Sequence, residues 1–485
     1  MTILDLFDAA LADRADAPAF DGVTYGQLHA GARRVAALLA ARGLRAGDRL
    51  ALFTENRIGF VYAYLAALRS GVVAVPTNVL YRASDLQHVL DDSGAAAVVV
   101  SDTSRAFVGP LERRPPAIDV AEVEAWAVDP SVLPASLPAR APDEVAIVMY
   151  TSGTTGRSKG AMLTLGNLAA IAAQVVVAWR WRCDDVLLIA LPLFHMHGLG
   201  AALNGTLAAG AHIVVHERFD AQRILAELGT GRYSMFFGVP TMYVRLLEHA
   251  PATPPSLRVW VSGSAALSPD VHAAFAARFG ADVLERYGAT EFGFVLTNRY
   301  GGPRVAGSVG VPSVGTSVAI VSPGTTDPVP PGDVGELLVA GPTVFAGYWN
   351  RPEATADAFA GGAGERWYRS GDLARYDHEA DVYRIVGRIK ELIVSGGFNV
   401  YPREIEVEIE RYPGVRGCAV VGIPDPARGE LPVAFVERDG DVDADALLGY
   451  LRGRLASFKV PKDVRFVDEL PRTALGKVEK GRLLL

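Results

Sequence analysis

Short apolar runs alternate with longer Ala- and Leu-rich stretches through the first two-thirds of the chain. Residues 24–44 carry apolar side chains at the spacing of a helix, and residues 48–55 have the character of a buried strand. Residues 58–71 again have helical spacing and end at Gly71, a residue type that commonly terminates helices, and residues 72–78 form the next strand-like run. This alternation predicts parallel sheets covered by helices.

The pattern changes twice in the last third of the chain. From about Gly310, short apolar runs are separated by Gly/Pro turns, which predicts a small antiparallel β subdomain. After Lys390 the runs indicate a compact α+β module. We therefore predict an α/β protein with a large N-terminal domain of helix-covered β-sheets plus a small β subdomain at residues 1–387, and a small α+β C-terminal domain at 391–485. Residues 388–390 connect the two domains, and the family resemblance described below implies that they form a hinge.

Composition excludes several classes of protein. Of 485 residues, 50% are hydrophobic and 21% are charged, which fits an ordinary globular protein with an ample core. The net charge of −7 argues against general nucleic-acid binding, which needs a basic surface. Cys183 and Cys418 lie far apart in sequence and offer neither a disulfide framework nor a metal-ligand cluster, so a reducing cytosol is the simplest location.

Two segments bear on targeting and membranes. Residues 1–20 contain Asp5 and Asp8 and lack the basic start and apolar core of a signal peptide, so we expect a cytoplasmic protein. Residues 186–216 contain no Asp, Glu, Lys or Arg, but Pro192, histidines and glycines interrupt them. A buried strand–turn–helix–strand unit therefore fits this segment better than a membrane span.

One stretch after a buried apolar run, MYTSGTTGRSKGAM at residues 149–162, is rich in Ser, Thr and Gly. A loop of small residues directs many backbone N–H groups to one point, which is how a chain cradles phosphate oxygens, and Lys159 adds a countercharge. The stretch is not a Walker loop, because Arg157 and Ser158 separate Gly156 from Lys159. A solvated linker or a plain surface turn are the alternatives, and the apolar residues on both sides disfavour the linker.

Three more stretches carry chemistry that suits a nucleotide. ERYGATE, at residues 285–291, offers an aromatic ring for stacking on a purine and a carboxylate for holding magnesium beside phosphates. Asp372 follows a glycine in YRSGDLARYD and suits a ribose diol, although an Asp after a Gly is more often only a turn residue. Lys477, in LPRTALGK, is by itself more often a solvated lysine. Only the combination indicates a nucleotide site.

Together and in this order, these motifs resemble those of the adenylate-forming superfamily, which includes acyl-CoA synthetases, adenylation domains of peptide synthetases and firefly luciferases. The resemblance covers essentially the whole chain. It implies that the Gly-rich loop holds the β and γ phosphates of ATP. It also implies that Tyr287 stacks on adenine, that Thr290 contacts the α-phosphate, and that Glu291, with Thr151, binds Mg²⁺.

The resemblance gives the two domains different tasks. Asp372 and Arg388 match ribose-binding residues, Lys390 matches the hinge of a mobile small domain, and Lys477 matches the lysine that bridges the acid and the α-phosphate. The loop that faces the thiol acceptor comprises Ser395, Gly396 and Gly397. The expected catalytic residues are Lys477, Thr151, Glu291 and His195. The expected ATP-binding residues are Thr151, Ser152, Gly153, Thr154, Thr155, Gly156, Lys159, Gly263, Ser264, Ala265, Glu285, Arg286, Tyr287, Gly288, Thr290, Asp372, Arg388 and Lys477.

The acid pocket is expected around LPLFHMHGLG, residues 191–200, which aligns with the family segment whose histidine borders the acyl group. His195, Met196 and His197 are the candidates there, and ordinary core or turn histidines are the alternative. A polar ring in so apolar a stretch needs a partner.

The substrate expectation rests on a narrower resemblance. FGVPTMYVRLL, VSGSAAL and RVAGSVG are similar to the malonyl-CoA synthetase branch, in which Arg304 is expected to meet a second carboxylate; a solvated loop arginine is the alternative. Ala289 departs from that branch, which commonly has Met there. Phe292 and Phe294 add bulk that favours a small acid, unless they only pack the core.

The resemblance implies an AMP-forming acid:CoA ligase that uses ATP, Mg²⁺ and CoA, with malonate or methylmalonate as the expected acid. The other readings are a short- or medium-chain monocarboxylate ligase, an enzyme that loads a separate carrier protein, and a non-catalytic nucleotide-binding protein. The presence of both Lys477 and Glu291 disfavours the last of these. No nucleic-acid partner is expected, and the oligomeric state is left open.

Overall fold

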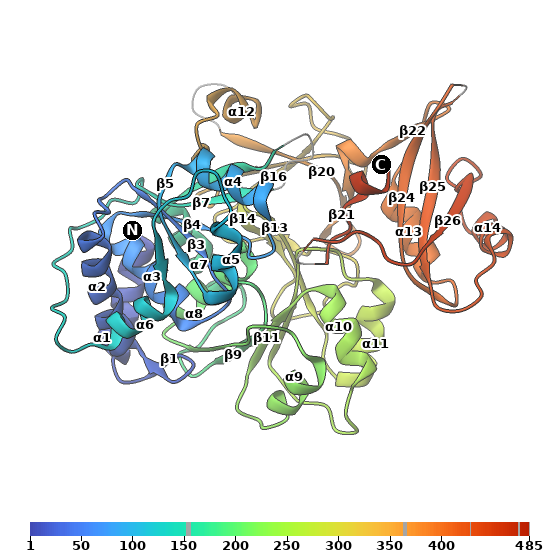
Figure 1. Ribbon diagram of the computed structural model, residues 1–485. Helices are drawn as coiled ribbons and strands as arrows, with labels where there is room; N and C mark the ends of the chain where they lie inside the picture. Colours follow the sequence, from blue (N-terminus) through green and yellow to red (C-terminus); the bar gives the residue numbers. More distant parts are fainter. Residues whose placement is uncertain (152–156, 362–365, 427, 474–475, 485) are drawn as a thin grey trace.

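The computed structural model describes residues 1–151, 157–361, 366–426, 428–473 and 476–484. Figure 1 shows a large N-terminal part and, on its right in orange and red, a small C-terminal part. This arrangement confirms the predicted α/β class with a large and a small domain. The limits at residues 387 and 391 stay a prediction.

The first sheet of the large domain is mostly parallel and runs in the order β18-β8-β7-β4-β3-β5-β6. Its strands are β3 (Arg49–Phe53), β4 (Val73–Pro76), β5 (Ala95–Val100), β6 (Ala117–Asp119), β7 (Val145–Thr151), β8 (Lys159–Thr164) and β18 (Gly347–Tyr348). Its helices are α2 (Tyr25–Ala41), α3 (Ile58–Ser70), α4 (Ala83–Ser93), α5 (Asp102–Val108) and α6 (Val120–Val128). The antiparallel β7–β8 hairpin carries the Gly-rich loop.

The second sheet runs in the order β15-β14-β13-β12-β11-β9-β10-β1-β2. Its strands are β1 (Pro18–Phe20), β2 (Val23–Thr24), β9 (Val186–Ile189), β10 (His212–Val215), β11 (Met235–Gly238), β12 (Val259–Ser262), β13 (Leu284–Ala289), β14 (Gly293–Thr297) and β15 (Val311–Pro312). Its helices are α1 (Ile3–Arg14), α7 (Leu165–Ala178), the π-helical segment η1 (His197–Leu203), α8 (Asn204–Ala208), α9 (Ala221–Leu228), α10 (Pro240–Glu248) and α11 (Pro269–Phe279). Because β9, β11, β12 and β13 are parallel, their carboxyl ends meet at one edge, where open α/β sheets bind ligands.

The third sheet is antiparallel, as the Gly/Pro-rich pattern after Gly310 predicted. Its strands are β16 (Ser317–Val321), β17 (Gly335–Ala340), β19 (Phe359–Ala360), β20 (Trp367–Asp377) and β21 (Val382–Arg388), with the helix α12 (Pro352–Asp357) beside them. Strands β20 and β21 lead toward the small domain (Figure 1).

The small domain has its own sheet and its own apolar core. The strands are β22 (Ile393–Ser395), β23 (Phe398–Val400), β24 (Val415–Asp425), β25 (Gly429–Arg438) and β26 (Asp463–Val467). The helical segments are η2 (Ile389–Glu391), α13 (Pro402–Glu410), α14 (Ala444–Arg452) and η3 (Lys480–Leu483). The chain therefore ends close to the junction with β21, since Lys480 of η3 pairs with Glu391 of η2 at 3.0 Å.

Two predicted details are confirmed and follow from local chemistry. Helix α3 ends at Gly71, whose φ of 82° lies in the left-handed region that glycine adopts without strain. Residues 186–216 form β9, η1, α8 and β10, and no helix in the described part of the chain combines the length and the apolarity needed to cross a bilayer.

Candidate active site

The stems of the Gly-rich loop are fixed by the β7–β8 ladder. Thr151, the last residue of β7, lies opposite Lys159, the first residue of β8. The Lys159 ammonium lies 5.0 Å from the centroid of the Tyr348 ring, at a distance where a cation is attracted to a ring face. Five predicted phosphate-binding residues lie outside the described residues: Ser152, Gly153, Thr154, Thr155 and Gly156.

Glu291 lies in the turn between β13 and β14 and is buried. Its Oε1 accepts hydrogen bonds from the Thr151 hydroxyl at 3.1 Å and from the Tyr348 hydroxyl at 3.2 Å. Burial raises the pKa of Glu291. No basic side chain among the described residues forms an ion pair with it, so this carboxylate and the neighbouring hydroxyl fit the oxygen ligands that Mg²⁺ prefers.

A second polar group joins the second and third sheets. Asp372 of β20 lies opposite Arg388 of β21 and pairs with its Nε at 2.9 Å. The hydroxyl of Tyr287, from β13, donates to the other oxygen of Asp372 at 2.5 Å. Burial raises the pKa of Asp372, and the Arg388 charge opposes this shift. The structure thus brings together the residues predicted to hold adenine and ribose.

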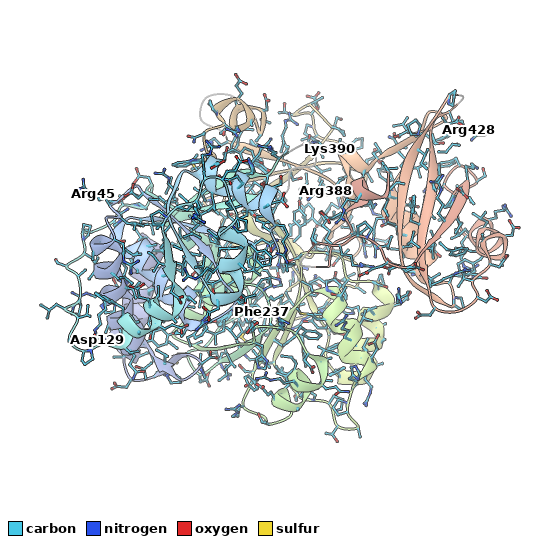
Figure 2. All side chains as sticks on the ribbon, viewed as in Figure 1. Arg45, Asp129, Phe237, Arg388, Lys390 and Arg428 are labelled. Carbon is cyan, nitrogen blue, oxygen red and sulfur yellow. The ribbon has the colours of Figure 1, made fainter. Side chains whose placement is uncertain are left out.

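Lys477 reaches this site from the small domain. Gly476, the residue before Lys477, lies against α10, since a Cβ at Gly476 would stand 3.2 Å from the Thr241 hydroxyl. The Lys477 side chain retains exposed surface, but the protein around its ammonium and then the Arg388 charge lower its pKa, while Asp372 acts in the opposite direction. Figure 2 shows Arg388 and Lys390 at the junction of the two domains.

The acid side begins with His195, Met196 and His197, which lead from β9 into η1. Two glycines make this path compact, because a Cβ at Gly198 would lie 2.3 Å from the Pro192 carbonyl oxygen and one at Gly200 would lie 2.1 Å from the Met196 sulfur. Such π-helical turns frequently occur at functional sites.

His197 lies in an aromatic setting without a polar partner. It is 2% exposed, its ring stacks on Phe237 at 6.0 Å and it lies 6.2 Å from the Phe294 ring. Neither ring nitrogen has a hydrogen-bond partner among the described residues. Burial, followed by the nearby Arg286 charge, holds the pKa of His197 well below its usual range; burial alone lowers the pKa of His195 to about 4. Both imidazoles are therefore neutral at pH 7.

Arg286 is a buried cation beside His197. It is 6% exposed, and its guanidinium carbon lies 4.3 Å from the Phe294 ring centroid. No carboxylate among the described residues pairs with it, and its Nε has no partner there. Burial lowers the pKa of Arg286 to about 9. A glycine is required at position 263, since a Cβ there would lie 2.2 Å from the Arg286 Nε.

The segment after β12 completes the surroundings of Arg286. The Ser262 hydroxyl is buried without a partner among the described residues, and Ser264 has a left-handed φ of 71°. Backbone strain of this kind in a non-glycine residue is concentrated at functional sites. Ser264 accepts a long hydrogen bond of 3.4 Å from Arg286, whereas Ala265 is exposed.

Arg304, which was expected to face the acid, contacts the chain just before β13, and its role toward the acid stays a prediction. Its guanidinium donates to the backbone carbonyl of Asp282, before the start of β13. Four residues of extended chain separate Asp282 from Arg286, which corresponds to about 13 Å. The unpaired cation beside the histidines is Arg286, which the sequence had placed only on the nucleotide side.

Other predicted residues have structural contacts. Glu285 accepts from the backbone N–H groups of Leu267 and Gly307, both at 3.2 Å, and burial raises its pKa to about 8. Gly288 permits the β13–β14 hairpin, because a Cβ there would lie 1.9 Å from the Gly293 carbonyl oxygen. Thr290 lies half-buried in the turn that follows.

The predicted thiol-side loop forms the β22–β23 turn. Ser395 lies opposite Phe398, and Gly396 and Gly397 both have positive φ, as a tight two-residue hairpin requires. The Gly396 N–H donates to the carbonyl of Arg428. Figure 2 shows Arg428 at the outer end of the small domain, far from Arg388, so this turn lies away from the nucleotide residues.

Sequence reasoning missed two residues that the structure adds to the site. Tyr348 holds Glu291 and faces Lys159, but it comes from the short strand β18, and no motif marks it. Thr241, against which Gly476 packs, stands in FGVPTMYVRLL, a stretch that the sequence linked only to the substrate branch.

Comparison with known proteins agrees with this geometry. The family described as AMP-binding enzyme matches residues 7–349, and its C-terminal domain matches residues 404–477. Feruloyl-CoA synthase of an Amycolatopsis species is 40% identical over 95% of this chain and 93% of its own length. Mitochondrial malonate–CoA ligase of Mus musculus is 34% identical over 91% and 83%. The crystal structure of ATP-bound MatB from Rhodopseudomonas palustris is 39% identical and superposes with a TM-score of 0.91 over 100% of this chain and 98% of that one.

Proposed function

Because this chain belongs to the AMP-binding enzyme family and is an acid:CoA ligase, we propose that its acid is a small molecule with a second anionic group, malonate first and methylmalonate next. The similarity to a malonate–CoA ligase supports this proposal. The similarity to a feruloyl-CoA synthase shows that family membership alone does not select the acid.

One observation carries the choice of acid: the buried, unpaired guanidinium of Arg286. A buried cation without a counter-ion is unfavourable, and a fork of N–H donors matches a carboxylate. The neutral His197 ring beside it also lacks a partner among the described residues. An acid that places a second carboxylate here satisfies both groups, whereas a monocarboxylate leaves them unpaired.

The reaction we propose has two steps. The acid carboxylate attacks the α-phosphorus of ATP and pyrophosphate leaves; the CoA thiol then attacks the acyl carbonyl and AMP leaves. Lys477 supplies positive charge where the acid meets the α-phosphate, and Lys159 supplies it at the departing phosphates. Glu291 and Thr151 would hold Mg²⁺, which neutralises phosphate charge when bound. Catalysis is then mainly positioning and electrostatic stabilisation.

The positions of Lys477 and of the Ser395–Gly397 turn support an exchange of roles between the steps. Lys477 lies beside Asp372 and Arg388, as the first step needs, whereas the turn lies at the outer end of the small domain. Rotation about Lys390 would withdraw Lys477 and bring the turn to the acyl-adenylate. An ion pair between Arg411 and Asp270 of α11, at 3.1 Å, holds the first arrangement and would have to break.

An aromatic monocarboxylic acid is the second candidate. The rings of Phe237 and Phe294 beside His197 offer stacking surfaces, and one relative is a feruloyl-CoA synthase. In this case Arg286 would have to bind a neutral oxygen substituent, which compensates a buried charge less well than an anion does.

The decisive experiment is an acid panel with ATP, Mg²⁺ and CoA, in which AMP, pyrophosphate and acyl-CoA are measured. We expect malonate and methylmalonate to exceed acetate, propionate and ferulate in kcat/KM, by up to ~10⁴-fold, because a site with a buried polar group rejects analogues that leave it unpaired. A preference for ferulate would contradict the dianion proposal. Formation of ADP and phosphate would contradict the adenylate route.

A further inference from the structure

Helix α4 packs against β7 and also contacts Ser158, the residue before β8. Val89 of α4 belongs to the same buried cluster as Val148 and Tyr150 of β7. Two polar residues of α4, His88 and Asp92, are four apart and therefore project from the same side of the helix. Neither belongs to a motif of the nucleotide site.

Asp92 holds the stem that enters the loop. Its Oδ2 accepts a hydrogen bond of 2.8 Å from the hydroxyl of Tyr150, the residue before Thr151. Tyr150 is 9% exposed and lies opposite Gly160, where a Cβ would come within 3.2 Å of the tyrosine ring. The tyrosine thus spans both strands of the hairpin, and Asp92 fixes its end.

His88 holds the stem that leaves the loop. Its Nε2 lies 2.8 Å from the backbone carbonyl oxygen of Ser158, so Nε2 must carry the proton and donate. The imidazole also meets the Tyr150 ring edge-on, with centroids 6.0 Å apart. Because a trans peptide is planar, fixing the Ser158 carbonyl also fixes the peptide plane that leads into Lys159.

Asp92 links these stems to the residues around Glu291. Its Oδ1 pairs with Arg351 at 2.5 Å. The backbone N–H of Arg351 donates to the carbonyl of Tyr348, whose ring faces Lys159 and whose hydroxyl donates to Glu291. One helix therefore connects both loop stems with the turn that carries Tyr348.

We propose that His88 and Asp92 are positioning residues that fix Tyr150 and the Ser158 carbonyl, and thereby place Thr151 and Lys159 for the β and γ phosphates of ATP. A carbonyl turned toward His88 is not turned toward the polyphosphate, where its negative end would repel the phosphate oxygens. This inference rests on the proposed assignment of the loop to those two phosphates.

Because the loop is assigned to the β and γ phosphates, a comparison of ATP with AMP distinguishes a positioning role from a general packing role. ATP carries the β and γ phosphates and AMP does not, so loss of a positioning residue must weaken ATP binding and spare AMP binding. A residue with a general packing role affects both nucleotides alike. Thioester formation from supplied acyl-adenylate likewise needs no β or γ phosphate.

The test compares His88→Ala, His88→Gln and Tyr150→Phe with the wild type by calorimetry with ATP and with AMP. We expect His88→Ala to raise the Kd of ATP about ten-fold, the upper range for one hydrogen bond, and to change the Kd of AMP less than two-fold. His88→Gln retains an N–H donor and should recover most of the affinity. Tyr150→Phe removes only a hydroxyl and should act as His88→Ala does, in a protein that still folds.

Two controls separate the possible failures. His249→Ala alters an exposed histidine that caps the C-terminus of α10 and should leave both affinities unchanged. Lys159→Met tests the loop assignment itself: if it spares ATP affinity, the proposed phosphate site and this inference both fail. If Lys159→Met weakens ATP binding but His88→Ala does not, or weakens ATP and AMP equally, only the positioning role is overturned.

Discussion

Replacing Arg286 by Met tests whether the acid pocket is built around an unpaired charge. Methionine has a similar length and no charge, so it fills the space beside Phe294 without leaving a large cavity. We expect the substitution to stabilise the ligand-free enzyme while it weakens binding of a dicarboxylic acid. A residue that only packs the core would give the opposite sign for stability.

The magnitude follows from the pKa of Arg286, which burial lowers from its ordinary value to about 9. Because a factor of ten in acidity corresponds to ~1.4 kcal/mol, the charged form is disfavoured in the folded state by about 5 kcal/mol. Loss of the contact with the Phe294 ring offsets about 1–2 kcal/mol of that. We therefore expect the free energy of unfolding of the variant to rise by about 3 kcal/mol.

The destabilisation caused by the buried Arg286 charge depends on pH in one direction. Below about pH 9 the guanidinium is charged in both the folded and the unfolded chain, so the unfavourable burial of the charge is fully present at pH 7. Above about pH 9 the unfolded chain binds more protons than the folded one, and the destabilisation fades. The stability difference between Arg286→Met and the wild type should accordingly be constant from pH 6 to 8.

The assay combines denaturant unfolding without ligand and steady-state kinetics with malonate and propionate. Removing one partner of a buried ion pair costs about 3–5 kcal/mol, so kcat/KM for malonate should fall ~10²–10³-fold, while the value for propionate stays the same or rises. Arg304→Met is the matched control, because the Arg304 guanidinium donates to the Asp282 carbonyl and its loss should leave the preference for malonate unchanged. Lower stability of Arg286→Met together with equal losses on both acids would refute the reasoning.

Three further outcomes are expected. Lys477→Ala should slow acyl-adenylate formation by about two orders of magnitude, since one placed donor contributes about 3 kcal/mol to a transition state; thioester formation from supplied acyl-adenylate should change little, and equal losses in the two half-reactions would argue against domain rotation. Tyr287→Phe should weaken ATP binding and lower the free energy of unfolding by about 1.5–3 kcal/mol, because the buried Asp372 carboxylate loses a donor; unaltered denaturation curves would show that the hydroxyl is dispensable. The Kd of sulfoacetate, whose sulfonate stays ionised, should be flat from pH 6 to 8 because the pKa of His197 lies well below that window; tighter binding at pH 6 would indicate a histidine that becomes charged.

The fold was largely predictable because its signals are local. The alternation of strand-like and helix-like apolar runs predicted the parallel sheets. Gly71 was predicted to end a helix, and it does so in the structure. The π-helical turn at His197 was not predictable, since it depends on the Pro192 carbonyl and the Met196 sulfur filling the space that Gly198 and Gly200 leave.

The site was predictable only where a residue acts within a recognisable motif. Asp372 and Arg388 stand sixteen positions apart, and strand pairing brings them together as the resemblance implied. The acid-side role that we propose for Arg286 was not predictable, because Arg286 and Arg304 both belong to motif-bearing segments, and sequence alone does not reveal which guanidinium is buried without a counter-ion. That difference depends on tertiary packing, because position 263 is a glycine and Arg286 occupies the space that a side chain there would fill.

The two halves of the pocket differ in how their charges are balanced, and this difference explains how one scaffold can serve different acids. On the nucleotide side, Asp372 is already paired with Arg388 and hydrogen-bonded by Tyr287, so these three side chains are held in place before any ligand binds. On the acid side, Arg286 has no counter-ion among the described residues, and we propose that the substrate supplies the missing charge. Pairing within the protein gives a nucleotide site that is independent of the acid. An unpaired charge instead makes correct binding depend on one chemical group of the acid, so a single change at position 286 should alter the choice of acid without disturbing the binding of ATP.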